Sequence, residues 1–136
     1  MGLTRETVER AIATYIEAWE TQDPELILEV FTETAVYHER VLEEPTIRGH
    51  AGIRQYWTDK VVNAQANITC KLLNLYLDGA TAVAEWEAHF DDLAQDTRKR
   101  MREVAILEFD EERIAYLREY WASDGTSLHR DLDFVD

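Results

Sequence analysis

The sequence is poor in cysteine, proline, glycine and long apolar runs. Its 136 residues include one cysteine, Cys70, so no disulfide can form within the chain. The two prolines and five glycines form no linker, and no repeat divides the chain, which favours a single domain. No stretch approaches the roughly 18 consecutive apolar residues of a membrane span. The N-terminus lacks the apolar block of a secretion signal, so we expect a cytoplasmic protein.

Basic residues are scarce as well. Lys and Arg total 14 against 28 Asp and Glu, which gives a formal net charge of −14. Lys60, Lys71 and Lys99 are the only lysines. Binding to nucleic acid depends on clustered cations, and an anionic membrane repels an acidic chain. The composition therefore predicts that neither nucleic acid nor a membrane is a partner.

The first third of the chain has the periodicity of helices. Apolar residues follow Thr4 along one helical stripe, and threonine is a typical N-cap. Asp23-Pro24 predicts the start of a short second helix, because proline suits the first helical position. We expect a strand around residues 35–41 and a third helix that begins at Gly49.

From residue 67 onward the periodicity becomes that of strands. Strands are expected at residues 68–77, 80–91, 99–109 and 114–121. Asp78-Gly79 is a typical hairpin turn between the first two. Helices followed by hairpin strands predict an α+β fold, with about three N-terminal helices packed on a curved antiparallel sheet that encloses a pocket. We expect a single domain over residues 1–123 and an acidic tail over 124–136.

In such a fold, polar residues that point inward are the most informative about function. Trp86 shares its strand face with alanine and phenylalanine, so this face is expected to point inward. On the next strand the corresponding face contains Glu103 among apolar neighbours. An unpaired buried carboxylate is costly. Glu103 must therefore find a partner, raise its pKa or reach water.

Several segments resemble one known superfamily. They are Tyr15, Asp23-Pro24, Phe31, Ala35–Glu39, Gly49-His50-Ala51-Gly52-Ile53-Arg54-Gln55-Tyr56-Trp57, Ile106-Leu107-Glu108-Phe109, Arg113-Ile114 and Leu117-Arg118-Glu119-Tyr120-Trp121. Over about residues 5–122 the chain resembles the SnoaL-like, nuclear-transport-factor-2-like superfamily. That superfamily includes ketosteroid isomerases, scytalone dehydratases, limonene-epoxide hydrolases and polyketide cyclases. The resemblance implies a cystatin-like α+β cone. It also implies a homodimer through the outer sheet face, where Val83, Val104 and Ile106 are the apolar residues.

The resemblance to ketosteroid isomerases implies roles for two residues. Tyr15 takes the place of the tyrosine that donates to a developing enolate oxygen, and Glu39 takes the place of the general base. The position of the second oxyanion donor holds Ala105, which cannot donate a side-chain hydrogen bond. Half of that oxyanion hole is therefore missing.

The resemblance to limonene-epoxide hydrolases is incomplete in a different way. Glu119 corresponds to the last-strand aspartate of those enzymes, and Tyr37 to a tyrosine of the first strand. Their arginine and second aspartate fall on Trp86 and Ala88. The chain therefore reproduces neither of these catalytic sets in full.

The residues nevertheless predict one site. Carboxylates that share an apolar cavity repel one another and lose water, so at least one should have a raised pKa and move protons near neutral pH. Glu39 would be the base, Tyr15 the hydrogen-bond donor and Glu119 the second acid or orienting group. The pocket would be completed by Trp19, Tyr37, Tyr56, Trp86, Glu103 and Trp121. We therefore expect a cofactor-independent isomerase, dehydratase or cyclase that acts on a small apolar molecule.

Other interpretations of the same residues stay open. The pocket could hold a small molecule without chemistry, or the domain could serve only in dimeric assembly through the outer sheet face. Glu119 would pair with Arg102 or Arg118 if the strand faces were shifted by one residue. The histidines lack the spacing of metal ligands, so neither a metal nor another cofactor is expected.

Overall fold

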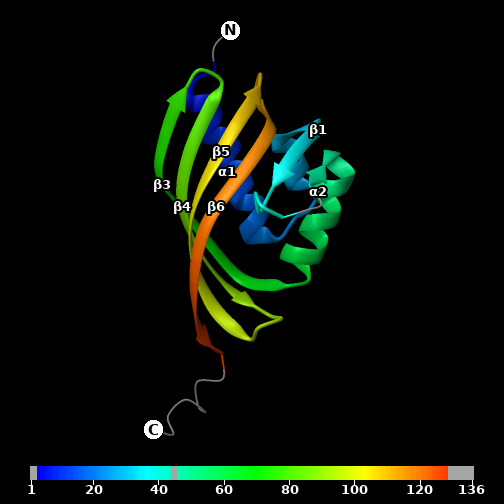
Figure 1. Ribbon diagram of the computed structural model, residues 1–136, viewed down its shortest axis with the longest axis vertical. Coiled ribbons are helices and arrows are strands. Elements are labelled where there is room, and N and C mark those ends of the chain that lie inside the picture. Colours follow the sequence, from blue (N-terminus) through cyan, green and yellow to red (C-terminus); the bar gives the residue numbers. More distant parts are fainter. Residues whose placement is uncertain (1–2, 44–45, 129–136) are drawn as a thin grey trace, which may run out of the picture.

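The computed structural model of the chain describes residues 3–43 and 46–128. Its helical elements are α1 (Arg5–Thr21), the 3-10 turn η1 (Leu26–Val30), α2 (Gly49–Trp57) and the π-helical turn η2 (Thr58–Val62). Its strands are β1 (Phe31–His38), β2 (Ile47–Arg48), β3 (Gln65–Asp78), β4 (Thr81–Asp92), β5 (Thr97–Asp110) and β6 (Arg113–Ser127). The long strands form a curved sheet whose inner face is covered by the helices (Figure 1). This is the α+β arrangement that the sequence predicts.

The strand order in the sheet is β2-β1-β6-β5-β4-β3. The pairs from β3 to β6 are antiparallel, as expected, but β1 runs parallel to β6, with Tyr37 opposite Leu117. The prediction of an antiparallel sheet is therefore wrong at this pair. Sequence periodicity shows which side chains share a face of the sheet. It does not indicate whether two strands that are distant in the chain run parallel or antiparallel.

The helices also differ in part from the expectation. Thr4 caps α1 as predicted, since its hydroxyl accepts the Thr7 N–H at 3.1 Å. Asp23 accepts two backbone N–H groups at 2.9 and 3.1 Å. The segment that follows is only the 3-10 turn η1, because the chain enters β1 at Phe31. The described residues thus contain two α-helices instead of three, and neither is long and apolar enough to cross a membrane.

The alternation along the central strands is confirmed. On β4, Trp86 and Phe90 are buried together with Ala82, Ala84 and Ala88. Trp86 lies directly opposite Glu103 of β5, so Glu103 also points inward and is only 3% exposed. The inner face therefore brings an acidic side chain into an otherwise apolar core.

The last strand is longer than the sequence suggests. β6 continues to Ser127, and its final residues pair with the start of β5. Arg100 on β5 forms an ion pair of 2.6 Å with Asp124, which stabilises this extension. The beginning of the expected tail therefore belongs to the sheet, because β5 is long enough to supply its backbone partners. The remainder, from residue 129, lies outside the described residues.

Candidate active site

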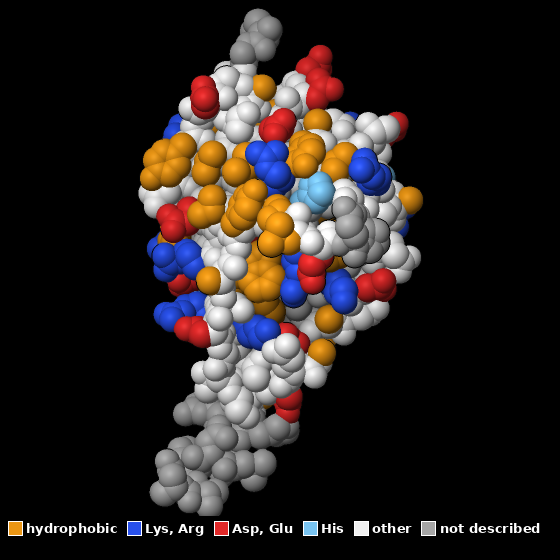
Figure 2. All heavy atoms as spheres, in the orientation of Figure 1, with side chains coloured by type: hydrophobic (Ala, Val, Ile, Leu, Met, Phe, Trp, Pro, Cys, Tyr) orange, Lys and Arg blue, Asp and Glu red, His pale blue; other side chains and the backbone are white. Residues whose placement is uncertain are grey.

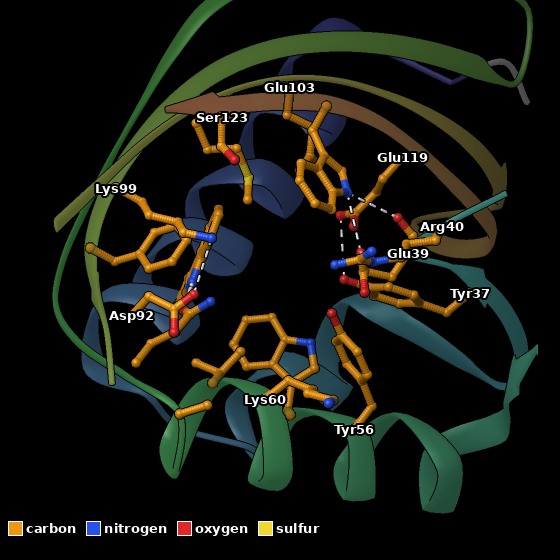
Figure 3. A pocket seen from close by; sticks show the side chains of 18 of the residues that line it. Tyr37, Glu39, Arg40, Tyr56, Lys60, Asp92, Lys99, Glu103, Glu119 and Ser123 are labelled. Atoms are coloured by element: carbon orange, nitrogen blue, oxygen red, sulfur yellow. Dashed lines mark hydrogen bonds and ion pairs between the residues drawn. The ribbon is translucent and has the colours of Figure 1, made fainter. Parts of the chain in front are cut away.

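A cavity of about 240 Å³ lies between the sheet and the segment formed by α2 and η2 (Figure 3). All but one of the predicted site residues line it: Tyr15, Trp19, Tyr37, Glu39, Tyr56, Glu103, Glu119 and Trp121. Trp86 is the exception. It is fully buried beneath Tyr15, with the two ring centroids 5.1 Å apart, and it lies outside the cavity lining. Its prediction as a pocket wall is therefore corrected, because Tyr15 covers its position in the centre of the sheet.

Glu103 and Glu119 form a buried acidic pair in this cavity. Glu103 on β5 pairs with Trp121, and Glu119 on β6 pairs with Ala105, so the two acids are diagonal neighbours. Their carboxyl groups are within hydrogen-bonding reach, and Glu119 is only 5% exposed. Oε2 of Glu103 is buried and receives no hydrogen bond from the described residues. A proton held between the carboxyl groups of Glu103 and Glu119 removes the repulsion between them. It also supplies the hydrogen-bond donor that the pair otherwise lacks.

Two tyrosines extend this pair into a chain of hydrogen bonds. The Tyr15 hydroxyl donates to Oε2 of Glu119 at 2.9 Å and lies 3.0 Å from the Tyr37 hydroxyl. Tyr37 also lies 3.3 Å from the same carboxylate oxygen. Because Tyr15 gives its proton to Glu119, its own oxygen can accept, so the single Tyr37 proton is shared between the Tyr15 oxygen and the same carboxylate oxygen. The chain Tyr37–Tyr15–Glu119 therefore aims two hydroxyl groups at one carboxylate oxygen.

The surroundings of Glu103 and Glu119 give their two carboxyl groups different pKa values. Burial raises the pKa of Glu103 well above its usual value, and repulsion by the charge of Glu119 raises it further. Burial also raises the pKa of Glu119, to about 7, although hydrogen bonds from Glu103, Tyr15 and Tyr37 act in the opposite direction. Near neutral pH, Glu103 is therefore the protonated partner and Glu119 exchanges its proton. Such divergence within a carboxyl pair is typical of acid–base sites.

The tyrosines stay protonated over the same range. Burial is the largest cause that raises the pKa of Tyr15 and of Tyr37, and the nearby charge of Glu119 raises both further. Both hydroxyl groups are therefore hydrogen-bond donors at neutral pH.

Glu39 lies at the rim of the cavity, just beyond the end of β1. Its Oε2 accepts the indole N–H of Trp121 at 3.2 Å and pairs with Arg40 Nε at 3.2 Å. The side chain is 21% exposed. Figure 3 shows Glu39 and Arg40 together on the side of the cavity formed by Tyr37 and Tyr56. Glu39 thus shares the predicted site, but its charge is compensated by Arg40.

The alternative pairing of Glu119 with an arginine is wrong. Arg118 pairs with Glu108 at 2.7 Å, and Arg102 pairs with Glu87 at 2.5 Å. Both arginines occupy positions of the outer sheet face, opposite to the face that carries Glu119. The strand faces assigned from the alternation are therefore confirmed. Within residues 3–43 and 46–128, no cluster of His, Cys, Asp or Glu is arranged to hold a metal ion.

Sequence reasoning missed several residues of the lining. They include Arg40, Trp57, Lys60, Asp92 and Lys99. Trp57 falls within the helix expected from Gly49, where an aromatic residue is ordinarily part of the core, and charged residues ordinarily lie on solvated surfaces. Two of the three lysines of this acidic chain, Lys60 and Lys99, line the cavity.

Comparison with known proteins gives a family match and a set of similar folds. The SnoaL-like domain profile matches residues 12–117. No curated protein matches the chain in sequence. An LEH-like epoxide hydrolase of M. tuberculosis has a TM-score of 0.70 and 18% identity, over 86% of this chain and 84% of that one.

Two further solved structures are similar. The epoxide hydrolase/cyclase-like enzyme SalBIII, of pyran ring formation in the polyether salinomycin, has a TM-score of 0.74 and 21% identity over 89% of this chain and 97% of its own. A hypothetical protein of ketosteroid isomerase-like fold from Catenulispora acidiphila, in complex with trimethylamine, has a TM-score of 0.73 and 17% identity. The match covers 93% of this chain and 88% of that one. At these identities the likeness shows the fold alone.

Proposed function

Because this chain belongs to the SnoaL-like domain family, we propose that its cavity is the active site of a cofactor-independent acid–base enzyme. The substrate would be a small, largely apolar molecule. One observation carries this proposal: a buried carboxyl, Glu119, lies against a second one, Glu103, and burial raises its pKa to about 7. A group that titrates near the working pH is well suited to accept and return protons.

Glu119 is the general base in this proposal, in place of Glu39. Glu119 is buried in the cavity, and its proton is exchangeable at neutral pH. Glu39 is partly exposed, and its charge is compensated by Arg40 at 3.2 Å. A desolvated carboxylate takes a proton from a substrate more readily than one held by a guanidinium group. Glu39 would then help to close the rim of the site through Trp121.

Glu103 is the general acid. Its pKa is raised well above its usual value by burial and by Glu119, so it carries a proton to donate. Glu119 would remove one proton from the substrate while Glu103 protonates a second position, and the two carboxyl groups then re-equilibrate. The proton count balances without an oxidant, a reductant or a cofactor. Isomerisation, dehydration and ring closure all follow this scheme.

Tyr15 and Tyr37 orient the base. The hydrogen bond from Tyr15 to Glu119 at 2.9 Å, supported by Tyr37, fixes the orientation of this carboxylate through its Oε2 atom. Aromatic side chains of Trp19, Tyr56 and Trp121 form walls that suit a flat apolar group. The names of the similar structures, epoxide hydrolase, cyclase-like and ketosteroid isomerase-like, support the same class of chemistry.

The test is turnover of a panel of small epoxides, hydroxy ketones and β,γ-unsaturated ketones by the wild-type protein and by Glu119→Gln. Turnover by the wild type that is lost in the variant would support the proposal. Equal turnover by both proteins would contradict the role of Glu119 as the base, and turnover of no compound by the wild type would favour a pocket that binds without chemistry.

We also propose that two copies of the chain associate through the outer face of the sheet. Tyr76, Val104 and Tyr120 are 62%, 37% and 46% exposed there, next to Val83 and Ile106. Figure 2 shows apolar side chains gathered over this face, with basic and acidic groups interspersed. Two copies related by a twofold axis can bury the apolar part and bring opposite charges together.

This second proposal predicts a change of mass in solution. The wild type is expected to be a dimer by size-exclusion chromatography with light scattering, and Val104→Glu is expected to weaken the dimer at least about tenfold, because it places a charge in the apolar patch. Leu42→Glu is the matched control, since Leu42 is 96% exposed on the loop that follows β1. A monomeric wild type, or equal dissociation of both variants, would contradict the proposed interface.

A further inference from the structure

Lys60 is the basic residue of the cavity lining that forms no ion pair with the described residues. Arg40 pairs with Glu39 and Glu43, at 3.2 and 3.3 Å, and Lys99 pairs with Asp92 at 3.2 Å. Lys60 also borders a second hollow that adjoins the cavity and shares Tyr37, Glu39 and Tyr56 with it. It therefore places an uncompensated ammonium group where the cavity meets its surroundings.

A buried donor without an acceptor lies on the same segment. Trp57 lines the cavity and is only 1% exposed, yet its indole N–H has no hydrogen-bond partner among the described residues. A buried donor left unpaired is costly and is rare in native proteins. Trp57 and Lys60 are three residues apart at the junction of α2 and η2, so they lie on one side of that segment. The cavity lining thus holds an unpartnered indole N–H and an ammonium group on one segment.

The charges of the lining favour an anion at this pair. The carboxylates of Glu39 and Asp92 are already paired with basic side chains. Glu103 and Glu119 share a proton on the sheet side of the cavity, and Figure 3 shows Lys60 across the hollow from Glu103. In a chain of net charge −14, this side of the cavity is therefore a local positive site.

We propose that the molecule taken by the cavity is a small apolar carboxylate, whose carboxylate group is held by Lys60 Nζ and Trp57 Nε1. This inference rests on the proposed use of the cavity as a substrate pocket. The apolar part would lie along the aromatic walls, and the reacting atoms would face Glu119. A carboxylate satisfies both donors at once through charge-assisted hydrogen bonds. A neutral molecule of the same shape would satisfy them less well.

The test compares 2-naphthoate with 2-naphthamide, which have the same ring system and differ in charge. Isothermal titration calorimetry at neutral pH is expected to show at least tenfold tighter binding of the carboxylate by the wild type. Lys60→Met is expected to abolish this preference. Trp57→Phe, which keeps an aromatic ring and removes the N–H, is expected to reduce it. Lys71→Met removes the same charge from an exposed site on β3 and is expected to leave the preference unchanged.

Equal binding of the two probes by the wild type would overturn the inference, as would binding of neither probe or a preference that survives Lys60→Met. Glu119→Gln separates this inference from the proposed function, because it removes the base but retains both donors. Loss of turnover in Glu119→Gln without any carboxylate preference in the wild type would sink only the inference. A carboxylate preference with turnover unaffected by Glu119→Gln would sink only the proposed chemistry.

Discussion

Replacement of Glu119 by glutamine is expected to lower kcat by about 10²–10⁴-fold, the range typical of a lost general base. Glutamine keeps an oxygen that can accept the hydrogen bond from Tyr15, but it cannot take a proton from the substrate. Steady-state kinetics on the substrate identified by the panel would measure the loss. The pH dependence near neutrality should disappear together with the activity, since burial raises the pKa of Glu119 to about 7.

Glu39→Gln is the matched control for this experiment. It makes the same chemical change in the same cavity, at a carboxylate that is paired with Arg40 and accepts the Trp121 N–H. We expect it to lower kcat by less than about tenfold. A larger loss in Glu39→Gln than in Glu119→Gln would return the role of base to Glu39 and contradict the assignment made from the structure.

Glu103→Gln is expected to stabilise the protein increasingly as the pH rises. The folded pKa of Glu103 is raised well above the unfolded value of 4.5, so over this range the folded state holds a proton that the unfolded state has released. The free energy of unfolding of the wild type therefore falls with rising pH by up to about 1.4 kcal/mol per pH unit from this group. Glutamine resembles the protonated acid in shape and does not titrate.

Chemical denaturation of both proteins at several pH values would measure this difference. Glu103→Gln should gain stability relative to the wild type as the pH rises above about 4.5, because only the wild type loses stability through this group. Glu87→Gln is a control of opposite sign, because its hydrogen bond with Arg102 lowers the pKa of Glu87. That variant should lose stability relative to the wild type over the acidic range in which Glu87 ionises. If the free energy of unfolding of Glu103→Gln changed with pH in the same way as that of the wild type, Glu103 would not be held protonated in the folded state.

The alternation of the strands was sufficient to predict the most informative part of the site. Period-two patterning placed Glu103 among inward-facing residues, and the resemblance of the last strand singled out Glu119. Burial of both residues is confirmed. Their contact with each other was not predicted, because it depends on the register between β5 and β6. In that register Glu119 lies opposite Ala105, one step from Glu103 on the inner face.

The parts that were wrong or missed depend on how distant segments meet. Trp86 was expected at the cavity, but Tyr15 from α1 covers it, and sequence patterns do not show which aromatic ring lies above another. The short η1 and the parallel pairing of β1 with β6 likewise result from tertiary packing. Lys60 and Trp57 were not predicted to line the cavity. A charged side chain is ordinarily expected on the solvated surface, and an aromatic residue of a helix is ordinarily expected in the core.

The central claim is that Glu103 stays protonated beside Glu119 and that Glu119 gains and loses its own proton near neutral pH. Carbon-13 NMR titration of the glutamate side-chain carboxyl groups tests it most directly, with Glu119→Gln to assign the signal. We predict one carboxyl with a titration midpoint at about 7, absent from that variant, and a second that stays protonated to higher pH. Titration of every glutamate close to the usual value of about 4.3 would contradict the account.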